Sequence, residues 1–595
     1  MATIRDHLEA RVAVPSSWNT DGSRLLIQSN LPGTMQLFER SMDGSMSQLT
    51  DDNEPVSGRY LPATDRIVVQ RDQGGSERSQ LYFLTASGEL EPLMVEPEWI
   101  HDAGGASRDG RFLAYRTNRR NGTDFDVFVI DIDSGEERCV YAEGGYAVAD
   151  AFSPDGSWLA IIKETERSGD NDVLLVHTAT GEIVHVNPHD DEASASGPAW
   201  LPDSSGFFFA TDIGRDVPAI AFYDMTRRSF DYVLETGWEC QCAVDWEGHH
   251  LLVVTNEEGW TRAELRDPRT LELKGEVPLP GTGVAISWCF SKDGRHLAFH
   301  FTSPTLPGDV WSFDTGSTEL RRLTASPCSV ELSDLAEPTL HRYEAQDGES
   351  VPVFLYRRTT AHGSTPVVVV IHGGPESQAR PSWNPVIGYL TERGYAVAVP
   401  NVRGSTGYGK RYQHLDDRRL RLDSVADLAA LHEWLGTQDG IDAARAALYG
   451  GSYGGYMVLA GLTFQPDRWA AGVDIVGISS LVTFLQNTSA YRRRVREREY
   501  GFLDVDGDFL REASPLTHLD RLRAPLFIIH GANDPRVPLS EAEQLFATLK
   551  DKGIRSEFLV YPDEGHGLQK LANRLDAYPK VVGFLDDVLG VVSGG

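Results

Sequence analysis

The chain has 595 residues, which is too long for a single hydrophobic core, so two to four domains are expected. Its composition is globular, with 41% hydrophobic and 24% charged residues. The formal net charge of −32 argues against a nucleic-acid partner, because a protein that binds phosphates must supply Lys and Arg. Such a charge fits a soluble protein with an acidic surface, or a preference for substrates that carry amines.

Cysteine usage and the absence of long apolar runs exclude further classes. The five cysteines are odd in number and irregularly spaced, so we expect buried free thiols in a reducing compartment. Cys240 and Cys242 are one residue too close for the usual zinc or redox pair. Residues 1–14 have no apolar centre typical of a signal peptide, and no run of 18 apolar residues predicts a membrane span. The expected location is the cytoplasm, without a membrane partner.

Residues 1–14 are expected to form a helical segment that precedes the first repeat and can pack on the C-terminal domain. From residue 15 to residue 332, a turn followed by a short apolar strand recurs seven times. The acidic residue of the turn falls at positions 21, 65, 109, 155, 203, 247 and 293. The interval varies only between 44 residues (21 to 65) and 48 residues (155 to 203).

The repeat predicts a seven-bladed β-propeller over residues 15–332. Asp-Gly supplies the positive φ that a tight hairpin needs, and the apolar run after it alternates as a half-buried strand. A second hairpin follows in each unit, for example at residues 126–136. A unit of about 45 residues with four short strands is typical of one propeller blade. A β-sandwich or an open array is the alternative, which the regular period disfavours.

Residues 333–595 have a different pattern, in which apolar strands alternate with amphipathic helices. Continuous apolar strands joined through helices indicate a mostly parallel, doubly wound sheet that is covered on both faces. The predicted strands are 367–371, 396–399, 446–449, 472–476, 526–529 and 558–561, and the clearest helices are 424–435 and 540–550.

The strongest chemical signal is the sequence Gly450-Gly451-Ser452-Tyr453-Gly454. It follows an apolar strand and opens an apolar helix, which is the setting of the nucleophile elbow in α/β-hydrolase folds. Glycines flank the serine because a sharp strand-to-helix turn leaves no room for Cβ atoms. We therefore predict an α/β-hydrolase domain with Ser452 as its nucleophile.

A serine hydroxyl needs a base, and in this fold the partners follow in the order Ser, Asp or Glu, His. Asp534 lies just after a strand, where α/β sheets place their sites, and His566 follows the last strand between two glycines. Asp534 is expected to orient the imidazole and stabilise its charged form.

Four other residues compete less well for these roles. His530 is expected to be a packed core residue, and His432 to lie at the surface of a helix. Asp563 and Glu564 are too near His566 in sequence to orient it easily.

The oxyanion of a tetrahedral intermediate needs two N–H donors. One is expected from Tyr453, the residue after the nucleophile, and the other from the loop His372-Gly373-Gly374-Pro375. Gly374 is favoured and Gly373 is the alternative. His372 is expected to anchor the loop, since the mechanism needs only one base.

The segment after strand 472–476 is expected to line a specificity pocket. Apolar or aromatic residues in it suggest an apolar substrate side chain, although plain core packing has the same composition. The candidates are Val476, Phe484, Leu485 and Tyr491. Arg403 and Arg492 are candidates to bind a substrate carbonyl or carboxylate, with surface ion pairs as the alternative.

Five motifs together resemble the prolyl oligopeptidase family of serine peptidases, within it the acylaminoacyl-peptidase-like branch, and the resemblance covers the whole chain. They are HGGP at 372–375, NVRGSTGYG at 401–409, GGSYGGYM at 450–457, HGANDPRVP at 530–538 and DEGHG at 563–567.

The resemblance implies a triad of Ser452, Asp534 and His566, with oxyanion donors Tyr453 and Gly374. It also implies a cofactor-free and metal-free enzyme that cleaves short or N-terminally acylated peptides, because the propeller limits substrate size. An aminopeptidase, or an amidase or esterase for small molecules, is the alternative on the same triad. The pair of glutamates with which dipeptidyl peptidases hold a free amine cannot be placed in this sequence. Family members form dimers and larger rings, so the resemblance leaves self-association open.

Overall fold

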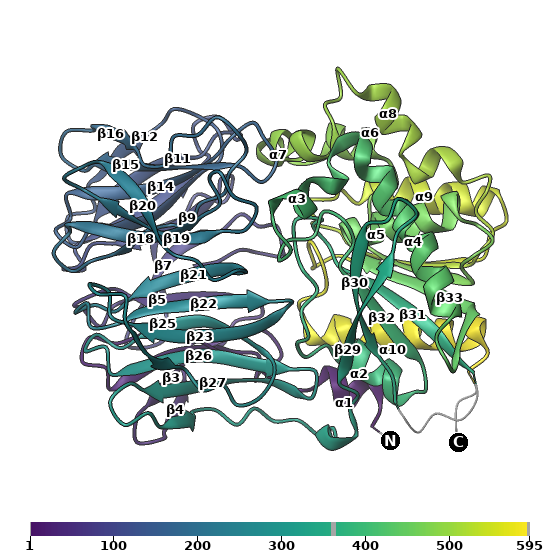
Figure 1. Ribbon diagram of the computed structural model, residues 1–595, viewed down its shortest axis with the longest axis horizontal. Coiled ribbons are helices and arrows are strands. Elements are labelled where there is room, and N and C mark those ends of the chain that lie inside the picture. Colours follow the sequence, from purple (N-terminus) through teal and green to yellow (C-terminus); the bar gives the residue numbers. More distant parts are fainter. Residues whose placement is uncertain (1, 359–363, 592–595) are drawn as a thin grey trace.

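The computed structural model describes residues 2–358 and 364–591, and it contains two bodies side by side (Figure 1). One body consists of strands only, and the other combines helices with a single large sheet. Residue 1 and residues 592–595, at the outer ends of the two predicted terminal segments, lie outside the described part. The predicted combination of a propeller and an α/β-hydrolase domain is confirmed.

Seven four-stranded antiparallel sheets form the propeller, and each is built from four consecutive strands. The first four blades comprise β1 (Ala13–Trp18), β2 (Arg24–Ser29), β3 (Gln36–Ser41) and β4 (Met46–Gln48); β5 (Val56–Tyr60), β6 (Ile67–Arg71), β7 (Gln80–Leu84) and β8 (Leu90–Met94); β9 (His101–Ala106), β10 (Phe112–Thr117), β11 (Asp126–Asp131) and β12 (Glu137–Tyr141); and β13 (Ala147–Phe152), β14 (Trp158–Glu164), β15 (Asn171–His177) and β16 (Ile183–His185). The last three comprise β17 (Ala199–Trp200), β18 (Gly206–Thr211), β19 (Ala219–Asp224) and β20 (Ser229–Leu234); β21 (Glu239–Val244), β22 (Leu251–Glu257), β23 (Trp260–Arg266) and β24 (Leu273–Glu276); and β25 (Val284–Phe290), β26 (His296–Ser303), β27 (Leu306–Asp314) and β28 (Leu320–Arg322).

Neighbouring blades pack face to face through apolar side chains. Val127 and Val129 of blade 3, for example, share one buried cluster with Leu159 and Ile161 of blade 4. Blades 1 and 7 meet in the same way, since Ile27 of blade 1 shares a buried cluster with Val310 of blade 7. Among the described residues, each propeller sheet takes all its strands from one blade. The ring is therefore closed by side-chain packing and not by a shared strand.

The α/β-hydrolase domain is built on one eight-stranded sheet with the strand order β29-β30-β32-β31-β33-β34-β35-β36. The pairs from β32 to β36 are parallel, and β29 and β30 add an antiparallel hairpin at one edge. The strands are β29 (Pro338–Glu344), β30 (Ser350–Tyr356), β31 (Thr365–Ile371), β32 (Ala396–Pro400), β33 (Ile441–Gly451), β34 (Ala471–Ile475), β35 (Leu526–Gly531) and β36 (Ser556–Tyr561). The helices are α2 (Pro385–Glu392), α3 (Lys410–Gln413), α4 (Arg421–Gly436), α5 (Tyr453–Phe464), α6 (Leu481–Asn487), α7 (Ala490–Tyr500), α8 (Gly507–Glu512), α9 (Ser540–Asp551) and α10 (Leu571–Leu589), with short 3-10 turns η1 (Leu332–Asp334), η2 (His414–Asp416), η3 (Arg418–Leu420) and η4 (Pro515–His518).

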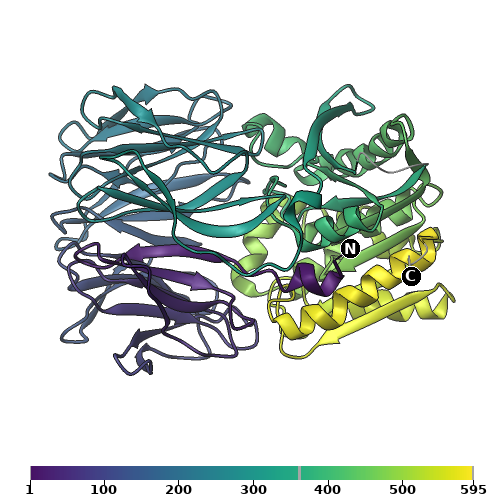
Figure 2. The ribbon, with the colours of Figure 1, turned by 90° about the horizontal axis from the view of Figure 1, so that it is seen from below.

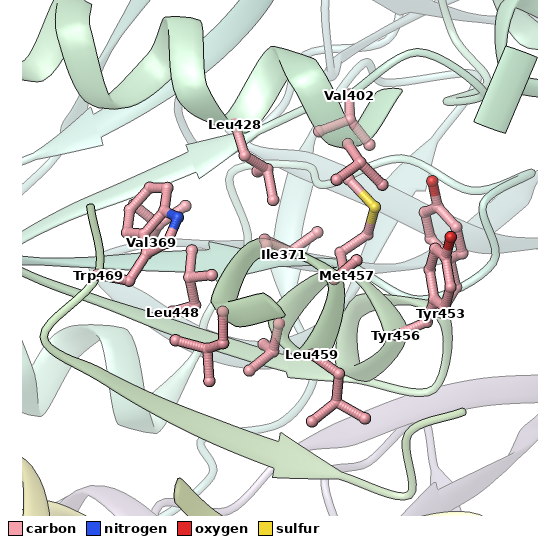
Figure 3. Packing of buried hydrophobic residues seen from close by; sticks show 14 of the residues in the cluster. Val369, Ile371, Val402, Leu428, Leu448, Tyr453, Tyr456, Met457, Leu459 and Trp469 are labelled. Atoms are coloured by element: carbon pink, nitrogen blue, oxygen red, sulfur yellow. The ribbon is translucent and has the colours of Figure 1, made fainter. Parts of the chain in front are cut away.

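The sheet of this domain is buried on both faces, as its continuous apolar strands predict. In β31, Val367 and Val369 belong to the core on one face, whereas Val368 belongs to the core on the other. Figure 3 shows part of the first core, in which Met457 of α5 lies among side chains of β31 and α4. Each such side chain contributes about 1.5–3 kcal/mol on burial, so α5 and the serine before it are held firmly.

The N-terminal helix α1 (Ile4–Leu8) lies on the α/β-hydrolase domain, beside α10 (Figure 2). Leu8 packs with Val582 of α10, and the ring of His7 lies 2.8 Å from the Glu392 carboxylate in a fully enclosed pair. The chain thus starts on the catalytic body, forms the propeller and then returns. The outgoing and returning segments are joined where the N–H of Arg11 donates to the Pro327 carbonyl at 2.8 Å.

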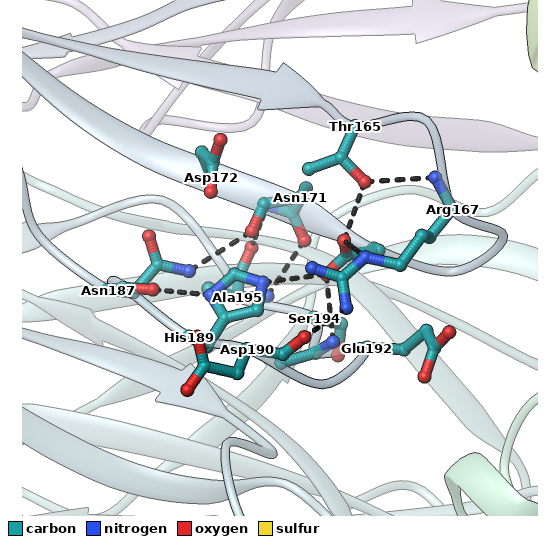
Figure 4. A network of polar contacts seen from close by, with 12 residues as sticks. Thr165, Arg167, Asn171, Asp172, Asn187, His189, Asp190, Glu192, Ser194 and Ala195 are labelled. Carbon is teal, nitrogen blue, oxygen red and sulfur yellow. Dashed lines mark hydrogen bonds and ion pairs between the residues drawn. The ribbon is translucent and has the colours of Figure 1, made fainter.

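A polar network supports the segment between β14 and β15 of blade 4 (Figure 4). This segment faces the catalytic body, since the Ser168 hydroxyl donates to the Glu376 carboxylate at 3.0 Å. The Asp170 carboxylate accepts hydrogen bonds from the Thr165 hydroxyl at 2.6 Å and from the backbone of Ala193 at 2.8 Å. The segment between β14 and β15 that this network supports reaches α7, where Glu166 pairs with Arg494 at 2.8 Å.

Some expectations are corrected by the structure. His432 is half-buried and its Nε2 lies 2.9 Å from the Ala443 carbonyl oxygen, so it is not a surface residue. All five cysteines are free as expected, but only Cys240 is buried. Cys139 is exposed, and Cys242, Cys289 and Cys328 are partly buried. The edge hairpin of β29 and β30 was not predicted. No helix in the described ranges has the length and apolar character needed to cross a bilayer.

Candidate active site

Ser452 lies in the sharp turn between β33 and α5. Its φ and ψ are 58° and −119°, a conformation that residues with a side chain rarely adopt. The turn places the serine at the carboxyl edge of the sheet and at the N-terminus of α5, whose dipole favours developing negative charge.

The glycines around the serine are required by close backbone contacts. A Cβ on Gly450 would lie 2.3 Å from the carbonyl oxygen of Gly454, and a Cβ on Gly454 would lie 2.2 Å from that of Ile371. Backbone atoms cannot rotate out of the way as a side chain can. Any larger residue at either position would therefore displace the nucleophile.

Asp534 and His566 come from the loops that follow β35 and β36. His566 Nδ1 donates to Asp534 Oδ2 at 2.7 Å, while Asp534 Oδ1 accepts from the backbone N–H groups of Arg536 and Val537 at 2.8 and 3.0 Å. This arrangement leaves the lone pair of His566 Nε2 free to accept a proton. His566 and Ser452 line the same cavity of about 170 Å³.

Two other histidines near the site have structural positions. His530 is fully buried, with its Nε2 2.9 Å from the Val537 carbonyl oxygen, and burial lowers its pKa. Burial also lowers the pKa of His372, whose ring nitrogens lie 2.8 Å from the Gly373 carbonyl oxygen and 2.9 Å from the Ser405 hydroxyl. Both are placed to hold loops rather than to act as the base.

Gly374 and Gly373, the two candidates for the second oxyanion donor, both lie close to Ser452. Gly374 lines the cavity that contains Ser452, and its carbonyl accepts from the Tyr500 hydroxyl at 3.5 Å. Gly373 also lies beside the serine, since a Cβ there would be 3.4 Å from the Ser452 Cβ and 4.0 Å from its hydroxyl oxygen. Tyr453, the other expected donor, begins α5 with its side chain fully buried.

A second cavity of about 390 Å³ adjoins the first and lies between the propeller and the catalytic domain. His566, Arg492 and Arg536 line both cavities. The smaller cavity is also lined by the apolar or aromatic residues Ile478, Phe484, Tyr500 and Val537 and by the charged residues Glu376 and Arg496. Blades 2 and 3 contribute acidic residues to the larger cavity, so a substrate at Ser452 also faces the propeller.

The predicted substrate-binding residues separate into two groups. Phe484 lines the smaller cavity, Tyr491 the larger one and Arg492 both. Val476 and Leu485 are buried in the two cores and line neither cavity.

Arg403 does not reach the substrate space either. It is 5% exposed and forms ion pairs with Asp427 at 2.6 Å and Asp347 at 2.7 Å. The prediction for Arg403, Val476 and Leu485 is corrected accordingly.

Arg536 was missed by the sequence reasoning. It lies two residues after Asp534, lines both cavities and donates from Nε to Glu77 of the propeller at 2.5 Å. Its place inside the motif HGANDPRVP was the available signal. No sequence signal indicated Glu77, because it lies 459 positions from Arg536 in the chain.

Glu77 belongs to the blade 2 loop, residues 72–79 between β6 and β7, which contacts both triad loops. Asn533, next to Asp534, donates to the Gly74 carbonyl at 2.8 Å. Gly75 lies against Gly565, next to His566, so closely that a Cβ on Gly75 would be 2.4 Å from the Gly565 nitrogen. The propeller thereby supports the loops of the acid and of the base.

A buried ionic cluster lies behind Tyr453. Arg421, Asp416 and Glu499 are at most 1% exposed, and Arg421 pairs with both acids. The Tyr453 hydroxyl donates to Asp416 Oδ2 at 3.2 Å. Burial raises the pKa of Asp416 to about 7 and that of Glu499 to about 8, although neighbouring arginines oppose the shift.

One group of side chains in the described part of the propeller has the spacing of metal ligands, namely Asp172, His185 and His189. Both ring nitrogens of His189 face acceptors, however: the Asn187 carbonyl at 2.5 Å and the Asp170 carboxylate at 2.7 Å. Burial disfavours its charge, but these hydrogen bonds outweigh burial and raise the pKa of His189. A protonated imidazole has no lone pair for a metal.

Comparison with known proteins indicates a family for the catalytic domain. Residues 381–592 match the model of the prolyl oligopeptidase family. The chain is 28% identical to dipeptidyl aminopeptidase BIII of Pseudoxanthomonas mexicana over 89% of its own length and 79% of that protein. It is 37% identical to dipeptidyl peptidase family member 6 of Caenorhabditis elegans over 38% of this chain and 31% of that protein.

The whole fold also has solved counterparts. A puromycin-hydrolyzing peptidase of Mycobacterium tuberculosis superposes with a TM-score of 0.87 at 23% identity, over 100% of this chain and 97% of the other. This likeness establishes the shared architecture of propeller and catalytic domain.

Proposed function

The catalytic domain of this chain belongs to the prolyl oligopeptidase family of serine peptidases, and on that premise we propose that the chain hydrolyses short peptides through an acyl-enzyme on Ser452. The observation that carries the proposal is the 2.7 Å hydrogen bond between Asp534 and His566, whose imidazole shares a cavity with Ser452. No cofactor or metal has a role in the proposed reaction.

In the proposed reaction, the Ser452 oxygen attacks the scissile carbonyl while His566 Nε2 takes its proton. Asp534 keeps Nδ1 protonated and stabilises the imidazolium that forms. The N–H groups of Tyr453 and Gly374 then hold the oxyanion, and each such donor typically contributes about 3–4 kcal/mol. His566 returns the proton to the leaving amine, and water releases the acyl group by the same steps in reverse.

The propeller is proposed to limit substrate size. The larger cavity lies between the two domains and has a volume of about 390 Å³, which holds a few residues but no folded protein. Peptides with N-terminal acyl groups as well as free peptides remain candidates. The free cysteines fit a reducing compartment, and the cytoplasm is the proposed location.

The test uses Ser452→Ala and a series of fluorogenic peptides of increasing length. Turnover is expected to fall on the order of 10⁶-fold in the variant, with unchanged thermal unfolding. In the wild type, kcat/KM is expected to drop once a peptide is too long for the cavity. Near-normal hydrolysis by Ser452→Ala would refute the nucleophile, and equal rates on long and short peptides would refute the size limit.

A second candidate is an aminopeptidase, which must bind a free α-amine. It is favoured by Glu54, which lines the larger cavity and has a buried Oε2 with no hydrogen-bond partner among the described residues. Matched p-nitroanilides with free and acetylated N-termini distinguish the two. Loss of activity on acetylation, reproduced by Glu54→Gln on the free substrate, would favour the aminopeptidase.

A further inference from the structure

Three arginines line the cavity that contains the proposed nucleophile, in a chain whose net charge is −32. Arg492 and Arg496 come from α7, at the face of the catalytic domain turned toward the propeller (Figure 1), and Arg536 comes from the loop of Asp534. In so acidic a protein, positive charge gathered at the reacting centre requires a specific explanation.

Two of the three arginines already have carboxylate partners. Arg496 pairs with Glu499 at 2.7 Å, and Arg536 pairs with Glu77 at 2.5 Å. Neither guanidinium therefore needs a substrate group to balance its charge.

Arg492 has no carboxylate partner at hydrogen-bond distance, only a longer contact with Glu77. Its nearest carboxylate oxygen belongs to Glu77 and lies 3.9 Å away, and Glu77 is already bound to Arg536. No other carboxylate of the described residues lies within 4 Å of it. The side chain is 21% exposed and lines both cavities, so its open side faces the substrate space.

The free enzyme holds this charge in unfavourable surroundings. Burial lowers the pKa of Arg492, and the charges of Arg536 and Arg496 lower it further, although it stays protonated. A bound anion would relieve this repulsion and would form charge-assisted hydrogen bonds with the planar guanidinium.

We propose that Arg492 binds a carboxylate of the substrate, so that the enzyme prefers short peptides with an acidic group next to the scissile bond. The carboxylate has two sources: an Asp or Glu side chain, or the free C-terminus of a very short peptide. The inference rests on the proposed peptidase activity and specifies its substrate class. A role in which Arg492 binds only an uncharged peptide carbonyl is the competing outcome.

The experiment compares substrates that differ only in one carboxylate. One pair of fluorogenic peptides has Glu or Gln as the residue whose carbonyl is attacked, and a second pair has a free or an amidated C-terminus. In the wild type, kcat/KM for the acidic member of at least one pair is expected to be about tenfold higher or more. The pair that responds identifies the source of the carboxylate.

Arg492→Met should reduce that ratio to about one, and Arg492→Lys should retain part of it. Arg493→Met is the matched control, because the side chain of Arg493 is 45% exposed and pairs with Glu497 within the same helix. It should leave the ratio unchanged.

Thermal unfolding of the free enzyme supplies a second readout. Arg492→Met should unfold at the wild-type temperature or above, since it removes one of three like charges. A clear fall would mean that Arg492 is a structural partner of Glu77 and would overturn the proposal.

Equal kcat/KM within both pairs in the wild type would also overturn it, as would an unchanged ratio in Arg492→Met. Failure to cleave any peptide would instead refute the proposed function itself, so the two failures are distinguishable.

Discussion

Replacing Gly75 by alanine should impair catalysis from the propeller, without touching any residue of the triad. The new Cβ would lie 2.4 Å from the Gly565 nitrogen, whereas ordinary van der Waals contact begins near 3.4 Å. The blade 2 loop or the Gly565 backbone must therefore move by about 1 Å, and His566 is the next residue. A displacement of that size at a reacting group lowers turnover on the order of 10²-fold.

Gly74→Ala is the matched control for this change. Gly74 and Gly75 both have positive φ values, 61° and 73°, so alanine at either position costs about 1–2 kcal/mol of backbone strain. The Cβ on Gly74 meets the end of the Asn533 side chain at 2.9 Å. That amide can shift at the cost of its hydrogen bond to the Gly74 carbonyl, and the Gly565 backbone is not displaced.

The assay measures kcat on one saturating peptide substrate, together with thermal unfolding of both variants. Similar unfolding temperatures with a much lower kcat for Gly75→Ala are expected. If kcat of the two variants agrees within a few-fold, the blade 2 loop does not position His566 and the reasoning fails.

Two further predictions concern charge. Asp534→Asn should lower kcat on the order of 10⁴-fold at neutral pH, because the amide favours the wrong imidazole tautomer; a loss below tenfold would contradict the role of Asp534. Burial raises the pKa of Asp474 from 3.8 to about 7. Between these two pH values the carboxyl group is protonated in the folded state and ionised in the unfolded state. Stability from this group is present below pH 4 and lost as pH rises to 7. The unfolding temperature should fall over this window, and less so in Asp474→Asn; equal slopes would exclude this contribution.

Much of the fold could be predicted because its signals are local. The seven turns recur at a regular interval, four of them with Asp-Gly, and the apolar runs of the parallel strands are continuous. The hairpin of β29 and β30 was missed because charged and polar residues interrupt β29. This strand lies at the edge of the sheet, and Tyr343 is its one buried residue.

The site was predictable where short motifs determine the backbone, as at Ser452 and in the glycines around it. Contacts between distant segments could not be predicted in this way. Arg403 finds its partners 24 and 56 positions away, and the pair of Glu77 and Arg536 spans 459 positions. An isolated arginine in a sequence does not indicate whether it faces a carboxylate or a cavity.

The two chain crossings between the domains lie next to each other, at Arg11 and Pro327. A rigid propeller connected to the catalytic domain at two adjacent points can move mainly by rotating about one axis through those points. Blades 1 and 7 adjoin this axis, so the gap would widen most on the far side, where the blade 4 segment meets α7. The ion pair of Glu166 and Arg494 would then be among the first contacts to separate, and peptides would enter from that side.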